Sequence, residues 1–461
     1  MSVTRRALLH SGLAASAALV TSRGARAMPV GNAPAGPAGH QHGAAAAAGA
    51  PAAPFAAAAP APAPAPAPGG AASRGHVVVP NGRTLPYQVK QGAKVFHLVA
   101  EPIRHEITPG LEIETWGYNG GSPGPLIEVT QGDRCRFYVT NKLPEPTTVH
   151  WHGVIVPCGM DGVAGLTQRA IPPGKTYRYE FVFGQAGTFM YHPHYDEMTQ
   201  IAFGMCGMIV VHPRGKDPRT DARGRRVRDY SLMAHEWKIP IGARRPDPMA
   251  MNDFNVLTFN SKAYPATAPL VAEKGELVRL RFGNLGPMDH HSIHLHGAPF
   301  QVVETDGGQV PMSARHPDTT VLVPVGAVRV VELVAEHPGD WALHCHMTHH
   351  VMNQMGHDVV NLTGANVEGL DARIRRAVPG YMTMGHTGMG EMMAMEQPRN
   401  SVSMRGGRGP HGTIDMGGMF TVLKIRERLR PGDEQGYFPA PPDTIAREAT
   451  AAELAGDGIE G

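Results

Sequence analysis

The chain has 461 residues, which is long for one domain and suggests two or three domains of about 150 residues each. Its 42 Lys and Arg nearly balance its 40 Asp and Glu, so it lacks the charge excess that binding to nucleic acid or to an anionic membrane needs. With 56 Gly and 42 Pro, turn-rich β structure and disordered stretches are favoured over long helices.

The first 75 residues are typical of an export signal followed by a tether. Arg5 and Arg6 precede a stretch of small apolar residues and an A-x-A cleavage motif at 25–27, which predicts a signal peptide over 1–27. The paired arginines resemble a twin-arginine signal, and a plain secretory signal is the alternative. Residues 28–75 are rich in Ala and Pro and are expected to form a disordered linker. No later apolar run approaches the ~20 residues of a membrane helix, so we expect a periplasmic protein without a membrane span.

From residue 76 onward the sequence repeats itself, which predicts two homologous domains. The repeated positions keep their order and nearly constant spacing: Gln131-Gly132-Asp133 returns as Lys274-Gly275-Glu276, His150-Trp151-His152-Gly153 as His294-Leu295-His296-Gly297, and Gly187, His192 and His194 as Gly339, His344 and His346. Short alternating runs at 134–139 and 277–282 are typical of antiparallel strands in a sandwich. We place the domains at 76–214 and 229–365, followed by a Met-rich extension and polar tail at 366–461.

Metal chemistry is suggested by 25 His and 24 Met beside only 4 Cys. Eight histidines form four His-x-His pairs: His150/His152, His192/His194, His294/His296 and His344/His346. On a strand, residues i and i+2 point to the same side, so each pair presents two imidazoles to one place. One pair alone is weak evidence, but four at repeat-related positions favour a shared site. Imidazole binds copper, zinc, iron or nickel, and eight exceed the needs of one ion, so a metal cluster is predicted.

A second candidate site surrounds Cys345, which lies between His344 and His346. With His291, His350 and Met355 it offers two imidazoles, a thiolate and a thioether, the ligand set of a blue-copper electron-transfer site. His349 and Met352 lie close by in the sequence and are the alternatives to His350 and Met355 as ligands. The remaining cysteines are candidates for disulfides whose pairing the sequence leaves open: Cys135, Cys158 and Cys206.

These motifs, together with WGYNGGSPGP at 116–125, resemble the copper motifs of the laccase-like multicopper oxidases over roughly 85–360. The resemblance implies an all-β chain of two tandem cupredoxin-like Greek-key sandwiches with four coppers. It implies type 1 copper at His291, Cys345, His350 and Met355, type 2 copper at His150 and His294, and a type 3 pair at His152, His192, His194, His296, His344 and His346. Electrons would pass from type 1 copper through Cys345 to the cluster.

Two repeats, rather than the three domains of many members, resemble the two-domain subgroup with type 1 copper in the second domain. His192-Pro193-His194 contains no cysteine, so no type 1 site is expected in the first domain. The resemblance further implies a homotrimer in which neighbouring chains share each cluster. Ser292 replaces the family's usual proline at a position that is not a ligand.

Dioxygen reduction consumes protons, so a carboxylate near the cluster is expected as a relay. Asp161 lies where the resemblance places this acid, and an Asp that forms a turn before Gly162 is the alternative. Asp196 and Glu197 are weaker candidates that would hydrogen-bond a ligand histidine.

The extension holds nine methionines between 382 and 419 without a helical period. Thioethers select Cu(I), so six of them are candidate Cu(I) docking residues: Met382, Met384, Met389, Met392, Met393 and Met395. A flexible loop or an adaptable contact surface is the alternative. Residues 420–425 are typical of a strand that returns to a domain.

We therefore expect a multicopper oxidase that couples one-electron oxidation of a donor to reduction of O2 to water. Cu(I), in copper tolerance, is the favoured donor. A laccase-like oxidase of phenols and a non-catalytic copper-sequestering protein are the alternatives. A copper nitrite reductase, with a single catalytic copper, does not account for the eight histidines.

Overall fold

The computed structural model describes residues 76–240, 242–354, 373, 376–377, 399–402 and 406–459. The expected signal peptide (1–27) and linker (28–75), Met355, and the six candidate docking methionines between 382 and 395 lie outside these residues.

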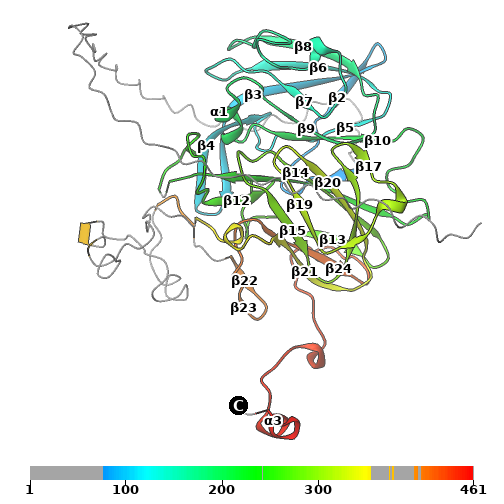
Figure 1. The fold of residues 1–461 in the computed structure, drawn as a ribbon, viewed down its shortest axis with the longest axis vertical. Coiled ribbons are helices and arrows are strands. Elements are labelled where there is room, and N and C mark those ends of the chain that lie inside the picture. Colours follow the sequence, from blue (N-terminus) through cyan, green and yellow to red (C-terminus); the bar gives the residue numbers. More distant parts are fainter. Residues whose placement is uncertain are drawn as a thin grey trace, which may run out of the picture. The chain divides into compact units, whose positions relative to one another are not determined.

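The first sandwich consists of two sheets that enclose an aromatic core (Figure 1). One sheet has the order β2-β3-β6-β8, with β4 also paired to β3: β2 (Tyr87–Lys90), β3 (Ala93–Thr108), β4 (Leu111–Tyr118), β6 (Arg134–Asn141) and β8 (Thr176–Val182). The other has the order β5-β10-β9-β7: β5 (Ile127–Thr130), β7 (His150–His152), β9 (Gly187–His192) and β10 (Gly207–His212). Alternation along β6 turns Phe137 inward, where its ring lies 4.5 Å from that of Trp151 on the opposite sheet.

The second sandwich repeats this plan, as the sequence repeat predicts. One sheet has the order β1-β11-β14-β20-β16-β17, with β12 on β11 and β18 on β16: β1 (Val77–Val78), β11 (Val227–Trp237), β12 (Val256–Phe259), β14 (Leu277–Asn284), β16 (Phe300–Thr305), β17 (Gly308–Gln309), β18 (Pro317–Asp318) and β20 (Val328–Val334). The facing sheet has the order β13-β24-β21-β15-β19: β13 (Leu270–Glu273), β15 (His291–Leu295), β19 (Thr320–Val323), β21 (Gly339–Cys345) and β24 (Phe420–Arg426). The all-β architecture is thus as expected.

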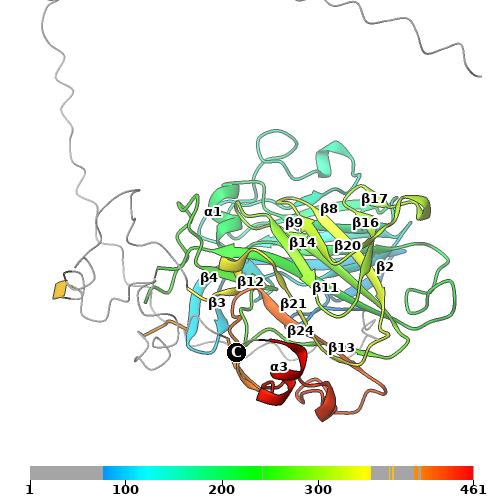
Figure 2. The same ribbon diagram turned by 60° about the horizontal axis from the view of Figure 1, so that its bottom comes forward.

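Strand pairings match between the repeats, since β3 pairs with β6 in parallel and β11 with β14 in parallel, while β7 pairs with β9 and β15 with β21. Two strands cross the expected domain limits. Val77 of β1 pairs with Asp229 of the second sandwich. The strand β24 pairs with both β13 and β21 (Figures 1 and 2). The second domain as bounded at 229–365 therefore omits a buried strand of its own sheet, because a long insertion separates β21 from β24.

The two sandwiches meet through an apolar cluster that includes Met190 and Met208 of the first and Val328 and Val330 of the second. A buried polar link lies beside it. Arg281 pairs with Asp229 at 2.7 Å and donates from Nη1 to Thr188 Oγ1 at 2.5 Å. These contacts hold the histidine-bearing strands of the first sandwich against the sheet that carries β11, β14 and β20.

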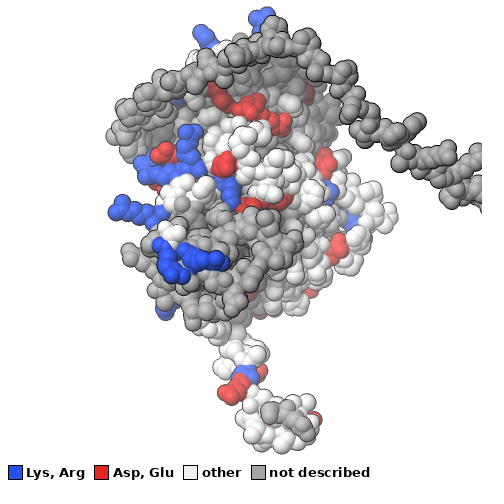
Figure 3. All heavy atoms as spheres, turned by 60° about the vertical axis from the view of Figure 1, so that its left-hand side comes forward, with Lys and Arg blue, Asp and Glu red and all other residues white. Residues whose placement is uncertain are grey.

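The remaining described elements are short: α1 (Glu197–Ala202), α3 (Ala451–Asp457), the hairpin β22 (Arg408–Gly409) and β23 (Gly412–Thr413), and the 3-10 turns η1 (Cys158–Met160), η2 (Met312–Ala314), η3 (Thr348–Val351) and η5 (Pro442–Thr444). No helix in the described part of the chain has the length and apolar character that crossing a membrane requires. The face drawn in Figure 3 carries both basic and acidic side chains, as the near balance of charges implies.

Candidate metal centres

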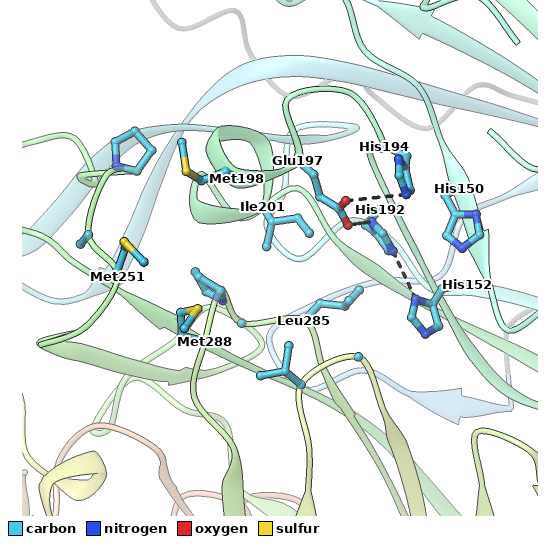
Figure 4. Close-up of a pocket in the computed structure, with 16 residues that line it drawn as sticks. His150, His152, His192, His194, Glu197, Met198, Ile201, Met251, Leu285 and Met288 are labelled. Atoms are coloured by element: carbon cyan, nitrogen blue, oxygen red, sulfur yellow. Dashed lines mark hydrogen bonds and ion pairs between the residues drawn. The ribbon is translucent and has the colours of Figure 1, made fainter. Parts of the chain in front are cut away.

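The first candidate centre is a quartet of histidines at the edge of the first sandwich, which we call quartet 1: His150, His152, His192 and His194 (Figure 4). Strand pairing places His150 of β7 opposite His192 of β9. The ligand nitrogens of His150, His152 and His192 lie within 4.8 Å of one another. His152 Nδ1 is 3.3 Å from His192 Nε2. This spacing fits imidazoles that converge on a metal.

Backbone carbonyls orient two rings of quartet 1. His150 Nδ1 donates to the carbonyl of Asp161 at 2.8 Å, and His192 Nδ1 to that of Pro193 at 2.8 Å. Each bond leaves Nε2 free to act as a ligand. Burial lowers the pKa of His192 to about 3, although the hydrogen bond to Pro193 opposes this, so the ring is held in its neutral, metal-binding form.

The second sandwich carries the matching set, quartet 2: His294, His296, His344 and His346. His294 Nδ1 donates to the carbonyl of Thr319 at 2.7 Å and His344 Nδ1 to that of Cys345 at 2.9 Å, so the equivalents of His150 and His192 have the same tautomers. His296 Nε2 lies 3.2 Å from His344 Nε2. The sequence repeat is therefore also a repeat of site geometry.

The two quartets remain separate within one chain. Among the described residues, every hydrogen bond and ring contact between two of these eight histidines joins members of the same quartet. Figure 1 draws β7 and β9 well apart from β15 and β21. These contacts within one chain do not join all eight histidines, and the expected sharing of one cluster between neighbouring chains stays a prediction.

A third centre brings together His291, Cys345 and His350, whose ligand atoms lie within 4.8 Å of one another and are all buried. Cys345 Sγ is 3.4 Å from His350 Nδ1 and 3.9 Å from His291 Nδ1. Burial would raise the pKa of the Cys345 thiol, but hydrogen bonds from His291 and His350 lower it to about 6. The thiolate is therefore the dominant form at neutral pH, as a copper ligand requires.

The structure selects between the neighbouring candidates for the cysteine site. His350 is buried beside Cys345, whereas His349 is exposed on the 3-10 turn η3. Met352 is buried, and Met355 lies outside the described residues. His350 is thus the histidine that the fold brings to the thiolate.

Two carboxylates behind this site were not expected from the sequence. Glu236, on β11, has Oε2 3.5 Å from His291 Nε2, and Asp289 has Oδ2 3.5 Å from His350 Nε2. Asp289 follows β14 closely and precedes His291 by two residues. This closeness in sequence to a candidate ligand could have identified Asp289 as a neighbour of the site. Glu236 is distant in sequence, and only the pairing of β11 with β14 brings it near.

The acids expected near the cluster do lie beside quartet 1. Asp161 Oδ1 is 3.4 Å from His150 Nδ1, and Glu197 has its two oxygens 3.3 Å from His192 Nδ1 and 3.7 Å from His194 Nε2. Asp161 also ends the turn η1, and the following Gly162 has a φ of 89° where a Cβ would overlap the backbone of Val149. Turn formation and proximity to His150 therefore both hold for Asp161. Asp196 is exposed just before α1 and makes no side-chain cap there.

All four cysteines are unpaired, so the three candidates form no disulfide: Cys135, Cys158 and Cys206. Cys135 and Cys206 are buried on different sides of the first sandwich, in its central core and in the cluster between the sandwiches. Burial raises the pKa of both thiols to about 12, which keeps them in the unreactive protonated state.

A cavity of about 520 Å³ opens beside quartet 1 (Figure 4). Three methionines line it, and they come from α1, from the loop before β12 and from the loop after β14: Met198, Met251 and Met288. Their exposed fractions are 55%, 72% and 52%, which is unusual for apolar side chains. Figure 4 places their thioethers at the end of the cavity away from the histidines.

Comparison with known proteins gives a consistent picture. Models of a family described as multicopper oxidase match residues 100–216 and 240–365. The chain is 28% identical over 333 residues to copper resistance protein A of Escherichia coli, covering 61% of this chain and 52% of that protein. It is 31% identical over 226 residues to laccase-1 of Cryptococcus neoformans var. grubii, covering 44% and 36%.

A crystal structure of blue copper oxidase from Nitrosomonas europaea superposes with a TM-score of 0.54 at 26% identity, covering 75% of this chain and 91% of that one. The chain thus spans about half the length of the curated E. coli relative but nearly all of a solved structure.

Proposed function

The chain belongs to the multicopper oxidase family, with two cupredoxin-like sandwiches, and from that premise we propose that it oxidises a one-electron donor and reduces O2 to water. Copper bound at these residues would supply one-electron transfer at the cysteine site and four-electron reduction of dioxygen at the histidine cluster. The observation that carries the proposal is the presence in one chain of a buried thiolate site and eight imidazoles in two quartets, four of them oriented by backbone carbonyls.

The residues take the roles that the family motifs give them, with four coppers per chain. His291, Cys345 and His350 would hold type 1 copper together with Met355, and His150 and His294 would hold type 2 copper. The type 3 pair would be held by the remaining six histidines: His152, His192, His194, His296, His344 and His346. Cys345 is flanked in the chain by His344 and His346, so its thiolate is covalently linked to quartet 2 within one residue on each side.

The separation of the quartets supports assembly of the cluster between chains. Quartet 1 and quartet 2 each supply half of the eight imidazoles, and no hydrogen bond or ring contact joins them within the described part of one chain. A second copy that places its quartet 2 against quartet 1 would complete the centre. A closed ring of such head-to-tail contacts gives the homotrimer that the two-domain subgroup implies.

Cu(I) is the donor that the site favours. Met198, Met251 and Met288 expose three thioethers to one cavity, and thioethers are soft ligands that select Cu(I). Met288 is bonded to Asp289, whose carboxylate lies 3.5 Å from His350 Nε2. A cuprous ion held by these methionines would therefore lie near a ligand of the cysteine site. The similarity to a protein named for copper resistance supports a role in copper tolerance.

Phenol oxidation is the second candidate, because several relatives are named laccases. The same cavity is largely apolar and would accept an aromatic ring as well as a metal ion. A copper-sequestering protein without turnover remains the non-enzymatic alternative. Oxygen uptake separates it from both oxidases.

The carboxylates beside quartet 1 are proposed to move the protons that dioxygen reduction consumes. Asp161 lies against His150, and Glu197 lies between His192 and His194 with part of its side chain open to solvent. Both carboxylates therefore connect the histidines with water. The periplasm is the proposed location and rests on the twin-arginine-like motif at residues 5–6.

Replacing the three cavity methionines by leucine tests the donor. Leucine keeps the apolar volume and removes the thioethers, so we expect kcat/KM for Cu(I) to fall on the order of tenfold while phenol oxidation keeps its rate. Met249→Leu is the matched control, since Met249 is 69% exposed on the same loop as Met251 but does not line the cavity. An equal loss of both activities, or an unchanged kcat/KM for Cu(I), would contradict this Cu(I) site.

A further inference from the structure

Glu236 is a carboxylate buried directly behind the cysteine site. It lies on β11 with none of its surface exposed. Its Oε1 accepts the backbone N–H groups of Met288 at 2.6 Å and of Asp289 at 2.8 Å. Because two donors fix one oxygen, the other oxygen has a fixed direction, and it faces His291 Nε2 at 3.5 Å.

The atoms that face each other have no other partner. Glu236 Oε2 and His291 Nε2 are both buried and make no other hydrogen bond among the described residues. A buried carboxylate oxygen and a buried ring nitrogen left alone would each cost free energy, so the pair is built to interact. The glycine at position 286 leaves space for the Glu236 carboxylate, because a Cβ there would overlap it.

The contact determines which nitrogen of His291 faces the metal site. An N–H on Nε2 directed at Glu236 leaves Nδ1 unprotonated, and Nδ1 is the nitrogen that lies 3.9 Å from Cys345 Sγ and 3.2 Å from His350 Nδ1. Carboxylates that accept from a ligand histidine in this way fix its ring and raise its basicity. The buried negative charge also favours the more positively charged state of a metal next to it.

We propose that Glu236 is a positioning residue for type 1 copper, which orients His291 and lowers the reduction potential of the site. The inference rests on the proposed function only in assuming copper at His291, Cys345 and His350. A low potential restricts the usable donors to strong reductants, so Glu236 would set donor range without touching the donor.

Asp289 provides an internal comparison. It faces His350 at 3.5 Å as Glu236 faces His291, but its side chain is 31% exposed. Water screens an exposed charge far more than a buried one. Neutralising Glu236 should therefore shift the potential more than neutralising Asp289 does.

The test is the reduction potential and the visible spectrum of the copper-loaded Glu236→Gln variant. Glutamine keeps the shape and an acceptor oxygen but removes the charge, so we expect the blue absorption to remain and the potential to rise. Glu304→Gln is the matched control, because Glu304 is 4% exposed on β16 of the same sheet and far from the cysteine site in strand order. An unchanged potential in Glu236→Gln, or an equal rise in Glu304→Gln, would overturn the proposal.

Gly286→Ala provides a second variant that leaves the carboxylate in the chain and displaces it. Gly286 lacks a positive φ, so alanine fits the backbone there, and the three atoms nearest to its Cβ all belong to the Glu236 carboxylate. Loss of a partner of a ligand histidine typically costs about 10–100-fold in metal affinity, and we expect a loss of that size for the type 1 copper. Unaltered copper affinity and spectrum in Gly286→Ala would overturn the positioning role. A wild-type protein without blue absorption would instead refute the proposed type 1 site.

Discussion

Single hydrogen bonds decide how the histidines of this chain can act as ligands. In both quartets a backbone carbonyl accepts from Nδ1 of the first and third members, at His150, His192, His294 and His344, so Nε2 faces the site. At the cysteine site the polarity is reversed, because His291 and His350 turn Nδ1 to the thiolate and Nε2 to a carboxylate. The proposed cluster and the proposed electron-transfer site therefore present opposite ring nitrogens to the metal.

The residue with the clearest predicted effect is Cys345. Replacing it by serine removes the thiolate, whose pKa hydrogen bonds from His291 and His350 hold at about 6 against the effect of burial, but leaves the histidines of both quartets in place. We expect Cys345→Ser to lose the blue absorption and donor oxidation and to retain the remaining copper. Absorption spectra, copper analysis and donor kinetics on the purified variant check this. Donor oxidation at the wild-type rate would show that electrons do not enter through Cys345.

The sequence identified the histidines and the cysteine that the fold brings together, but not the carboxylates beside them. The His-x-His pairs and the Cys345 neighbourhood were visible because ligands lie close in sequence and repeat. The choice of His350 over His349 needed the turn η3, which buries one ring and exposes the other. Glu236 could not be predicted, since no local pattern distinguishes it from other acids and only sheet pairing brings it to His291.

At the scale of elements, the two repeats differ in the connection that leads to the last strand of each sandwich. In the first sandwich β10 begins soon after β9, while in the second β24 follows β21 only after a long insertion that contains the methionine-rich segment. Both ends of the insertion return to the cysteine site. Met419 donates to the carbonyl of His350, and Cys345 donates to that of Met419.

Truncation tests the placement of β24. This strand lies between β13 and β21, and Leu423 and Ile425 are buried, so a chain that ends at residue 405 should fail to fold its second sandwich. A chain that ends at residue 440 loses only η5, α3 and exposed flanking residues, and its melting temperature should stay within about 3 °C of the full chain. Thermal unfolding and solubility of the two truncations decide the point. A soluble, cooperative 405-residue form would contradict the role assigned to β24.

The sequence predicted the returning strand at 420–425 but not its consequence for the domain boundary. Alternating apolar residues mark a strand, whereas its partners depend on which sheet has an open edge. The same reason explains β1, whose two residues lie before the first sandwich and pair with β11 of the second. A local sequence pattern can therefore predict that a strand forms, but not which distant strands it pairs with.

At the scale of the molecule, one chain brings together His291, Cys345 and His350 and, separately, the two histidine quartets. Strand pairing places the quartets on different sandwiches, and the contacts between sandwiches involve β9, β10, β14 and β20 rather than quartet 2. The repeat predicted two matching sets of histidines, and the structure places each set on its own sandwich. The sharing of a cluster between neighbouring chains comes from the family resemblance and stays a prediction.

The most direct measurement is oxygen uptake by a mixture of two inactive variants, one with His150→Ala and one with His294→Ala, purified separately and then refolded together with copper. Wild-type protein should consume oxygen with Cu(I) as donor, and each variant alone should not. If neighbouring chains share the cluster, the mixture regains uptake, because an intact quartet 1 of one variant meets an intact quartet 2 of the other. A mixture as inactive as its components would contradict a shared cluster, and wild-type protein without uptake would contradict the oxidase itself.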